Sequence, residues 1–295
     1  MKKRIFKGCG TALVTPMKDD YSVDYDALKV LVERQINAGV DALIVCATTG
    51  EAPTLKIDEH LKVIEKVIEY ADGRAKIVAG TGSNDTLHSV ETSKSAKELG
   101  ADGILSVTPY YNKPTGAGLI THFTYIADRV DLPLIVYNVP SRTGVSISPE
   151  VYLELSKHPN IVATKEASGN LALAAKIRAL CGDELDIYSG NDDVTVPLLS
   201  LGGIGTISVL SNVVPSDVCE MCRAYFDGDV ARAAELQIKY MGLIDALFCE
   251  TNPIMAKEAL AMMGLIECGM RMPLVRASAE HKNHLENELK KLGLI

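Results

Sequence analysis

A short apolar run near the middle of the chain ends on a lysine, and it reads Ile161-Val162-Ala163-Thr164-Lys165-Glu166-Ala167-Ser168-Gly169. The β-branched residues before the lysine are typical of a buried β-strand, and the small polar residues after it are typical of a turn. An ammonium group held against apolar surroundings loses hydration, which favours the neutral, nucleophilic amine. A lysine at a strand end can also extend its ammonium to water, so this stretch alone leaves both interpretations open.

Runs of the same kind recur along the chain, with helical patterns between them. The predicted strands are Cys9–Thr15, Ala42–Ala47, Lys76–Gly80, Gly103–Thr108, Leu134–Asn138, Ile161–Lys165, Asp186–Gly190 and Gly205–Val209. Their lack of strict alternation is expected for parallel strands that helices cover. One predicted helix repeats apolar residues at intervals of four and three, on a single face: Ile57, Leu61, Ile64, Ile68 and Ala71. Eight strand-then-helix units predict an α/β fold, a (β/α)8 TIM barrel, rather than an open doubly wound sheet.

The pattern changes at about residue 229. Helices are predicted over Ala231–Leu247, Pro253–Met263 and Ala277–Leu292, with no strand between them. We therefore expect a catalytic barrel over residues 1–228 and a C-terminal helical extension over residues 229–295. No low-complexity linker separates the two, so we expect the extension to pack on the barrel and to contribute to assembly.

Composition limits the possible functions. A length of 295 residues is normal for an α/β barrel with an appendage. The net charge of -8 argues against sequence-independent binding to nucleic acid, which needs a basic face. No apolar stretch approaches the roughly 18 residues of a membrane helix. The basic start, Met1-Lys2-Lys3-Arg4, precedes a segment that glycines interrupt, so we expect a first strand there and a cytoplasmic protein.

The cysteines and histidines do not predict a metal site. There are seven cysteines, and Cys46, Cys181 and Cys249 lie within apolar runs, as reduced core thiols do. The Cys219-x-x-Cys222 and His281-x-x-His284 pairs fall in helical patterns about sixty residues apart, whereas a zinc site needs four converging ligands.

Polar side chains follow several of the predicted strands, at the end of a barrel where catalytic residues gather. Thr48 and Thr49 offer hydroxyls just ahead of a helix. Tyr137 ends the fifth run. Arg142 follows on a turn, where its planar guanidinium can hold a carboxylate. A lysine amine forms a Schiff base with a carbonyl substrate, and a neighbouring tyrosine can move the protons of that reaction. With Lys165, these residues predict a class I aldolase-like site for 2-keto acids that uses no metal and no organic cofactor.

Together these motifs resemble the dihydrodipicolinate synthase family, within the superfamily of pyruvate-dependent class I aldolases and N-acetylneuraminate lyases. The resemblance covers nearly the whole chain. The presence of both Thr48 and Arg142 favours the synthases over the sialic-acid lyases. The matching segments are Thr11–Pro16, Thr48–Glu51, Gly80–Asn84, Pro109–Asn112, Tyr137–Gly144, Lys165-Glu166, Ser189–Asp192 and Gly205–Ser208.

The resemblance implies a condensation of pyruvate with aspartate semialdehyde in the diaminopimelate and lysine pathway. Lys165 would bind pyruvate covalently, and Tyr137, Thr48 and Tyr111 would form a proton relay, with Tyr111 reaching in from a neighbouring subunit of a homotetramer. The implied substrate-binding residues are Thr49 and the backbone of Ile207 for the pyruvate carboxylate, Gly190 as pocket wall, and Arg142 for the carboxylate of aspartate semialdehyde.

The same resemblance implies an effector pocket for lysine that departs from the family pattern. Ile57 stands where lysine-inhibited members have histidine, and His88 where they have glutamate, whereas Asn84, Tyr110 and His60 remain. We therefore expect weak or absent inhibition by lysine, since a carboxylate partner for its ammonium group is lost. Two other functions stay open: a pyruvate-dependent aldolase for a sialic acid or keto-deoxy sugar acid, and a non-catalytic barrel that senses a keto acid.

Overall fold

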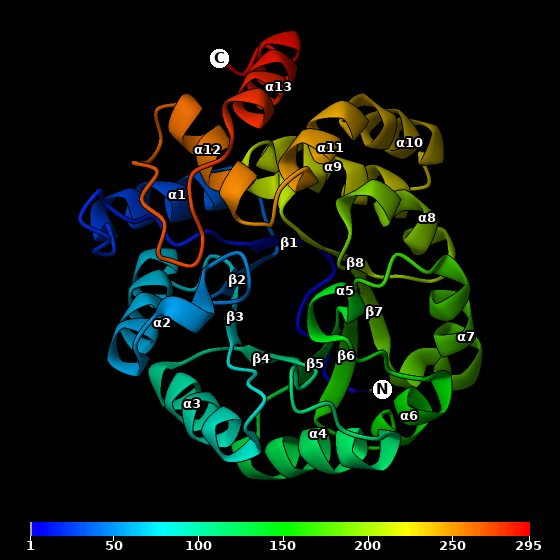
Figure 1. Cartoon of the computed structure of the whole chain (residues 1–295). Coiled ribbons are helices and arrows are strands. Elements are labelled where there is room, and N and C mark those ends of the chain that lie inside the picture. The colour runs from blue at the N-terminus through cyan, green and yellow to red at the C-terminus, as the bar shows by residue number, and fades with distance from the viewer. Residues whose placement is uncertain (1) are drawn as a thin grey trace.

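The computed structural model describes residues 2–295, so Met1 lies outside the described residues. Within this part of the chain, eight parallel strands form a closed barrel in sequence order, and β8 pairs with β1. Figure 1 looks along the barrel and shows the ring of strands inside a ring of helices. The strands are β1 (Gly8–Ala12), β2 (Ala42–Val45), β3 (Lys76–Gly80), β4 (Gly103–Val107), β5 (Leu134–Asn138), β6 (Ile161–Glu166), β7 (Asp186–Ser189) and β8 (Gly205–Ser208).

Helices surround the barrel and continue after its last strand. They are α1 (Tyr25–Asn37), α2 (Ile57–Ala71), α3 (Thr86–Leu99), α4 (Gly116–Val130), α5 (Pro140–Thr143), α6 (Pro149–Leu155), α7 (Leu171–Cys181), α8 (Thr195–Ser200), α9 (Pro215–Phe226), α10 (Val230–Lys239), α11 (Met241–Phe248), α12 (Ile254–Met262) and α13 (Ala279–Lys291). Short 3-10 helices are η1 (Ala52–Thr54), η2 (Gly182–Glu184), η3 (Asp192–Val194) and η4 (Leu210–Asn212). The predicted (β/α)8 barrel with C-terminal helices is confirmed.

All the predicted strands are present, but several end earlier than their apolar runs. The first run was expected to reach Thr15, yet β1 ends at Ala12. Beyond it, the Val14 N–H donates to Oδ1 of Asn212 at 3.2 Å, and the Thr15 hydroxyl donates to the carbonyl of Gly50 at 2.8 Å. The Val14 N–H is therefore not available to the sheet, because each backbone N–H can serve only one such partner well, and the Thr15 hydroxyl attaches the chain to the loop after β2.

The face of α2 that is buried differs from the predicted one. The structure buries His60, Val63, Ile64, Val67 and Ala71, whereas Ile57 is 48% exposed. A polar residue thus lies on the inner face, where Nε2 of His60 is 2.9 Å from the carbonyl oxygen of Gly80 at the end of β3. This bond satisfies a buried carbonyl, a role that an apolar periodicity cannot reveal.

The first predicted C-terminal helix, Ala231–Leu247, is in fact two helices, α10 and α11, that meet at Tyr240. The Tyr240 hydroxyl donates to the Asp217 carboxylate of α9, which fixes the bend. Gly242 then allows a close approach to α13, because a Cβ built on it would lie 2.5 Å from a carboxylate oxygen of Glu288. The bend therefore serves both contacts, and neither is visible in local periodicity.

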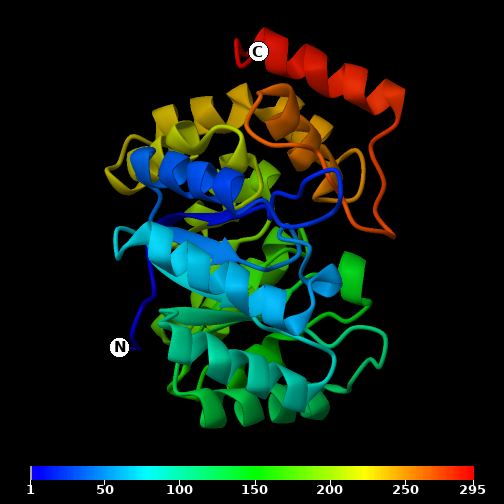
Figure 2. The same ribbon diagram turned by 90° about the vertical axis from the view of Figure 1, so that its left-hand side faces the viewer.

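The C-terminal helices pack on the barrel, as expected. Buried residues of α11, α12 and α13 share one apolar cluster with residues of α1, α2 and β1, so the extension has no separate core. Figure 2 shows α13 at the outer edge of the molecule, on the far side of α11 and α12 from the strands. None of the helices formed by residues 2–295 has the length and apolar character needed to cross a membrane.

The cysteines are free, and most are buried. Cys46 and Cys181 lie in the core as expected from their apolar runs, but Cys249 is exposed. The expectation fails at Cys249 because this residue caps the end of α11, where the chain leaves the core.

Candidate active site

Lys165 and Tyr137 lie opposite each other on the neighbouring strands β6 and β5. Ala163 belongs to the apolar cluster inside the barrel, and Lys165 lies two residues further along the same strand, so both side chains point inward. Ile135 and Tyr137 are related in the same way on β5. The Lys165 Nζ is 4.4 Å from the centroid of the Tyr137 ring. The structure therefore brings the predicted nucleophile and the predicted proton-transfer residue together.

The surroundings of Lys165 are closely packed, and only 4% of the residue is exposed. Gly190 leaves room for its side chain, because a Cβ built on Gly190 would lie 3.1 Å from Cε of Lys165 and 2.6 Å from the Cβ of Ala167. Asp192 interacts electrostatically with Lys165. Burial raises the pKa of Asp192, whereas a hydrogen bond with Ser208 and the positive charge of Lys165 oppose that rise. A lysine held in this way has few rotamers to lose when it reacts.

Thr49 and Arg142 are connected through one residue of the C-terminal extension, Asn252. The side-chain Nδ2 of Asn252 donates to Oγ1 of Thr49 at 3.0 Å, in a fully buried contact. Nη2 of Arg142 donates to the backbone oxygen of Asn252 at 3.0 Å. The two groups predicted to hold substrate carboxylates are thus attached to the same residue, from its two sides.

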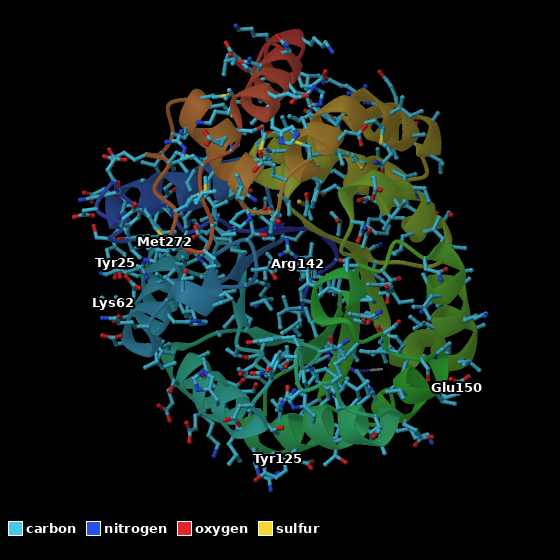
Figure 3. The ribbon with its side chains drawn as sticks, viewed as in Figure 1. Tyr25, Lys62, Tyr125, Arg142, Glu150 and Met272 are labelled. Atoms are coloured by element: carbon cyan, nitrogen blue, oxygen red, sulfur yellow. The ribbon has the colours of Figure 1, made fainter. Side chains whose placement is uncertain are left out.

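A cavity of about 540 Å³ opens at this end of the barrel, and Thr48, Tyr137 and Arg142 line it. Figure 3 shows Arg142 near the centre of the ring of strands. Five predicted residues are not part of the lining: Lys165, Thr49, Tyr111, Gly190 and Ile207. Lys165 nevertheless adjoins the cavity through Tyr137, and Thr49 does so through Asn252, which is a lining residue. The side chain of Ile207 is fully buried among the apolar residues inside the barrel.

Tyr111 does not line the cavity of its own chain. Its side chain is 92% exposed, and its backbone has a φ of 71°, in the left-handed region. Such a conformation costs a non-glycine residue about 1–3 kcal/mol and is concentrated at functional sites. The adjacent Tyr110 is 37% exposed and does line the cavity. The structure thus brings Thr48 and Tyr137 together but leaves the third member of the predicted relay pointing away.

Glu51, to which the sequence assigned no role, forms a buried ion pair. Its carboxylate lies 2.5 Å from Nζ of Lys257 on α12, and the two side chains are 1% and 0% exposed. The backbone N–H of Arg271 donates to its second carboxylate oxygen at 3.2 Å. Burial lowers the pKa of Lys257, and the charge of Glu51 opposes this effect. The loop that carries Thr48 and Thr49 is therefore attached to the C-terminal extension.

Glu166 organises the outer side of β6. Its buried carboxylate accepts hydrogen bonds from Asn138 at 2.9 Å, from the Tyr152 hydroxyl at 3.1 Å and from the backbone N–H of Ser168 at 2.8 Å. These bonds connect β5, β6 and α6 directly behind the strand ends that carry the lysine and the tyrosine. A sequence signal exists for this role, since alternation along the strand points Glu166 away from Lys165.

Sequence reasoning missed Asn252 and Lys257. The available signals were weak: a Thr251-Asn252-Pro253 turn ahead of a helix, and a single lysine within the apolar segment Ile254–Met262. The partners of these residues lie 203 and 206 positions away in the chain. Local pattern cannot identify such contacts.

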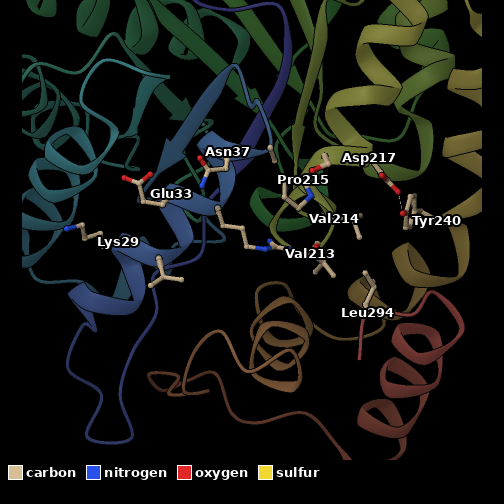
Figure 4. Close-up of a pocket in the computed structure, with 13 residues that line it drawn as sticks. Lys29, Glu33, Asn37, Val213, Val214, Pro215, Asp217, Tyr240 and Leu294 are labelled. Carbon is tan, nitrogen blue, oxygen red and sulfur yellow. Dashed lines mark hydrogen bonds between the residues drawn. The ribbon is translucent and has the colours of Figure 1, made fainter.

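A second cavity, of about 800 Å³, lies on the outside of the barrel between α1 and the start of α9. Figure 4 shows Lys29, Glu33 and Asn37 on one wall and the segment from Val213 to Asp217 on the other. The guanidinium of Arg34 donates to the backbone oxygens of Asn212 and Val213, both at 2.5 Å, so its charge supports the loop. Although this cavity is the larger, it lies outside the ring of strands, away from the reactive lysine.

Among residues 2–295, no three His, Cys, Asp or Glu side chains come together in a way that could hold a metal ion. The Cys219/Cys222 pair is buried on α9, and the His281/His284 pair lies on α13.

Comparison with known proteins identifies the family. The model of the Dihydrodipicolinate synthetase family matches residues 5–292. The 4-hydroxy-tetrahydrodipicolinate synthase of Caldicellulosiruptor saccharolyticus is 53% identical over 290 residues, which cover 98% of this chain and 98% of that protein. The dihydrodipicolinate synthase structure from Thermotoga maritima superimposes with a TM-score of 0.97 at 44% identity, over 99% of this chain and 100% of the other.

A chloride-inhibited dihydrodipicolinate synthase from Acinetobacter baumannii, complexed with pyruvate, is similar at a TM-score of 0.96 and 43% identity, over 98% of this chain and 99% of that chain. These relatives are enzymes, and each matches this chain from end to end. The family inferred from the sequence motifs is therefore confirmed: the chain is an enzyme that belongs to the dihydrodipicolinate synthetase family.

Proposed function

We propose that this enzyme is a 4-hydroxy-tetrahydrodipicolinate synthase, which condenses pyruvate with L-aspartate 4-semialdehyde through a Schiff base on Lys165. The observation that carries the proposal is the position of Lys165: its amine lies 4.4 Å from the centre of the Tyr137 ring, and the residue is only 4% exposed. A buried primary amine beside a phenol is the arrangement that imine chemistry needs. Every relative described above bears the name of a synthase of this kind.

The first half of the reaction forms an enamine. The neutral amine of Lys165 attacks C2 of pyruvate, and the resulting carbinolamine loses water to give an iminium ion. Loss of a proton from C3 then gives the enamine. Tyr137 is the donor and acceptor of these protons, with Thr48 and a Tyr111 from another subunit completing the relay. Thr49 and the backbone at Ile207 hold the carboxylate, with Gly190 beside them.

The second half joins the two substrates. The enamine carbon attacks the aldehyde carbon of aspartate semialdehyde, and the aldehyde oxygen takes a proton. The amine of the second substrate then attacks C2 of the iminium, closes the ring and expels the Lys165 amine. Arg142 holds the carboxylate of the semialdehyde, since a guanidinium offers two parallel N–H donors to such a group.

A borohydride experiment tests this proposal. Incubation with pyruvate and borohydride should reduce the imine and add a stable three-carbon adduct to the peptide that contains Lys165, as measured by peptide mass. The same protein should then be assayed with aspartate semialdehyde and with sugar-acid substrates in parallel. An unmodified Lys165 peptide, or turnover of a sugar acid in preference to the semialdehyde, would refute the assignment. The names of the relatives favour the synthase over that alternative.

We also infer that the enzyme works in the cytoplasm as a homotetramer, a dimer of dimers. The exposed and strained Tyr111 supports this assembly, because a left-handed tyrosine on a loop suits an interface better than open solvent. Mixing inactive Lys165→Ala subunits with inactive Tyr111→Phe subunits should restore part of the activity, since a mixed dimer contains one intact site. If subunits exchange, as followed by native mass, and activity stays at the level of the parents, Tyr111 does not act across an interface.

A further inference from the structure

The C-terminal extension reaches the mouth of the barrel through Asn252, just before α12. Asn252 is 6% exposed and lines the cavity that Thr48, Tyr137 and Arg142 share. Thr49 and Arg142 are the two side chains proposed to bind carboxylates. Among residues 2–295, Asn252 alone forms hydrogen bonds with both: its Nδ2 donates to Thr49, and its backbone oxygen accepts from Arg142.

The direction of the contact with Thr49 has a chemical consequence. A threonine hydroxyl has one O–H to donate and two lone pairs to accept with. Because the Asn252 amide donates to Oγ1 at 3.0 Å, it occupies a lone pair and leaves the O–H of Thr49 available as a donor. Thr49 is only 2% exposed, so water has little access to that donor. An anionic group entering the site is then the natural acceptor.

The opposite orientation of the amide would abolish this property. If Oδ1 of Asn252 faced Thr49, it would accept the hydroxyl proton, and Thr49 could no longer donate to a ligand. In the structure, Oδ1 is buried and has no hydrogen-bond partner among the described residues. An unsatisfied buried oxygen costs free energy, and such exceptions are more common at functional sites than in ordinary cores. The Asn252 amide thus leaves its Oδ1 without a partner while its Nδ2 donates to Thr49.

The ion pair one turn further along holds this arrangement in place. Nζ of Lys257 on α12 lies 2.5 Å from the carboxylate of Glu51. Glu51 is only two residues after Thr49 in the loop. The loop and the extension are therefore joined at two points, Thr49 to Asn252 and Glu51 to Lys257. Two fixed points restrict the rotation of the loop against the extension, as a preorganised binding group requires.

We propose that Asn252 is a positioning residue for pyruvate: its side-chain amide turns the Thr49 hydroxyl into a dedicated hydrogen-bond donor for the pyruvate carboxylate. This inference rests on the proposed function. It assigns the side chain of Asn252 to pyruvate alone, because Arg142 is attached to the backbone oxygen, which every substitution retains.

The test compares Asn252→Ala and Asn252→Asp with a control in the helix that follows, Glu258→Gln. Glu258 is buried on α12 and accepts from Arg276 at 2.6 and 2.8 Å, so its substitution loosens the extension away from the cavity. Asn252→Ala should raise the KM for pyruvate about tenfold, with kcat and the KM for aspartate semialdehyde changed by less than about threefold. Asn252→Asp should raise the pyruvate KM further, because a carboxylate accepts the Thr49 proton and repels the substrate. Glu258→Gln should lower the melting temperature and leave both KM values as in the wild type.

Epistasis and trapping complete the design. In a Thr49→Val background, Asn252→Ala should have no additional effect on the pyruvate KM; additive effects would overturn the inference. A pyruvate KM of Asn252→Asp within twofold of the wild type would also overturn it, and this variant is isosteric, so the result holds even if Asn252→Ala fails to fold. If the wild type gives no borohydride adduct with pyruvate, the proposed function falls and this inference with it. A wild-type adduct together with an unchanged pyruvate KM in both variants would overturn the inference alone.

Discussion

The amine of Lys165 lies over the ring of Tyr137, 4.4 Å from its centroid, because the two residues are register partners on β6 and β5. An aromatic face stabilises a neighbouring positive charge by about 0.5–2 kcal/mol, depending on desolvation. The proposed reaction places the positive charge of an iminium ion on this nitrogen. Tyr137 can therefore act twice: its hydroxyl moves protons, and its ring faces the nitrogen that becomes charged.

Substitutions at Tyr137 should separate these two roles. Tyr137→Phe keeps the ring and removes the hydroxyl, so we expect turnover to fall by about 100-fold, since general acid–base groups contribute 10²–10⁴. The borohydride adduct with pyruvate should still form, although more slowly. Tyr137→Leu removes the ring as well and should slow adduct formation further. Equal rates of adduct formation in the two variants would show that the ring has no influence on the nitrogen.

Arg142 should affect only the second substrate. Arg142→Lys replaces a planar fork by a point charge, and we expect kcat/KM for aspartate semialdehyde to fall by about 10- to 100-fold, with adduct formation from pyruvate unchanged. A matched control is Arg129→Lys, since the Arg129 guanidinium stacks on Tyr125 at 3.3 Å on the surface of α4. Steady-state kinetics of the two variants should be measured together. Equal values of kcat/KM for aspartate semialdehyde in Arg142→Lys and Arg129→Lys would contradict the assignment.

The buried Glu51–Lys257 pair should matter more for stability than any surface pair. Lys257→Met leaves the Glu51 charge buried without its partner, which typically costs about 3–5 kcal/mol. The double substitution Glu51→Gln with Lys257→Met removes both charges and should recover part of this loss. The surface pair Lys62–Glu65, at 48% and 45% exposure, provides the comparison, and Lys62→Met should change stability by less than about 1 kcal/mol.

Denaturant unfolding, followed by circular dichroism, gives these values. If Lys257→Met and Lys62→Met shift the unfolding midpoint equally, the buried pair does not hold the extension to the barrel. Recovery in the double variant distinguishes an unpaired charge from simple loss of packing.

Lysine should inhibit this enzyme weakly or not at all. Ile57, His60 and His88 line the cavity, and Glu51 is the one carboxylate among the lining residues within the part of the chain that the structure describes. That carboxylate is paired with Lys257, so the ammonium of a lysine effector has no free acidic partner. We expect turnover to be inhibited by less than half at about 1 mM lysine, because a weak site has a dissociation constant of about 1 mM or higher.

A gain-of-function variant makes this expectation decisive. Ile57→His combined with His88→Glu introduces the residues that the family resemblance associates with inhibition, and should make turnover more sensitive to lysine. Strong inhibition of the unaltered enzyme at sub-millimolar lysine would show that the cavity binds the effector by other contacts.

The sequence predicted the barrel well because short apolar runs recur eight times, each followed by a helical pattern. It predicted strand ends less well, since Val14 continues the apolar run although its N–H donates to the side chain of Asn212 instead of to the sheet. Strand order predicts that Lys165 and Tyr137 lie on neighbouring strands, but their direct pairing depends on a register that shifts between Leu134 and Ile135. The contacts of Asn252 and Lys257 could not be predicted, because they join segments more than 200 positions apart through single polar pairs.

Acid should destabilise the fold through His60. Burial lowers the pKa of His60 to about 4 from its ordinary value of 6.5, partly offset by the hydrogen bond with the carbonyl of Gly80. Between these two values the unfolded chain binds a proton that the folded chain does not, so stability is unaffected above pH 6.5 and falls as the pH decreases toward 4. At pH 5 the loss is on the order of 2 kcal/mol.

His60→Gln keeps an N–H for Gly80 and cannot titrate, so its melting temperature should fall less between pH 7.5 and pH 5 than that of the wild type. His284→Gln, on the exposed side of α13, should behave like the wild type, and equal pH dependence in all three proteins would exclude His60 as the source.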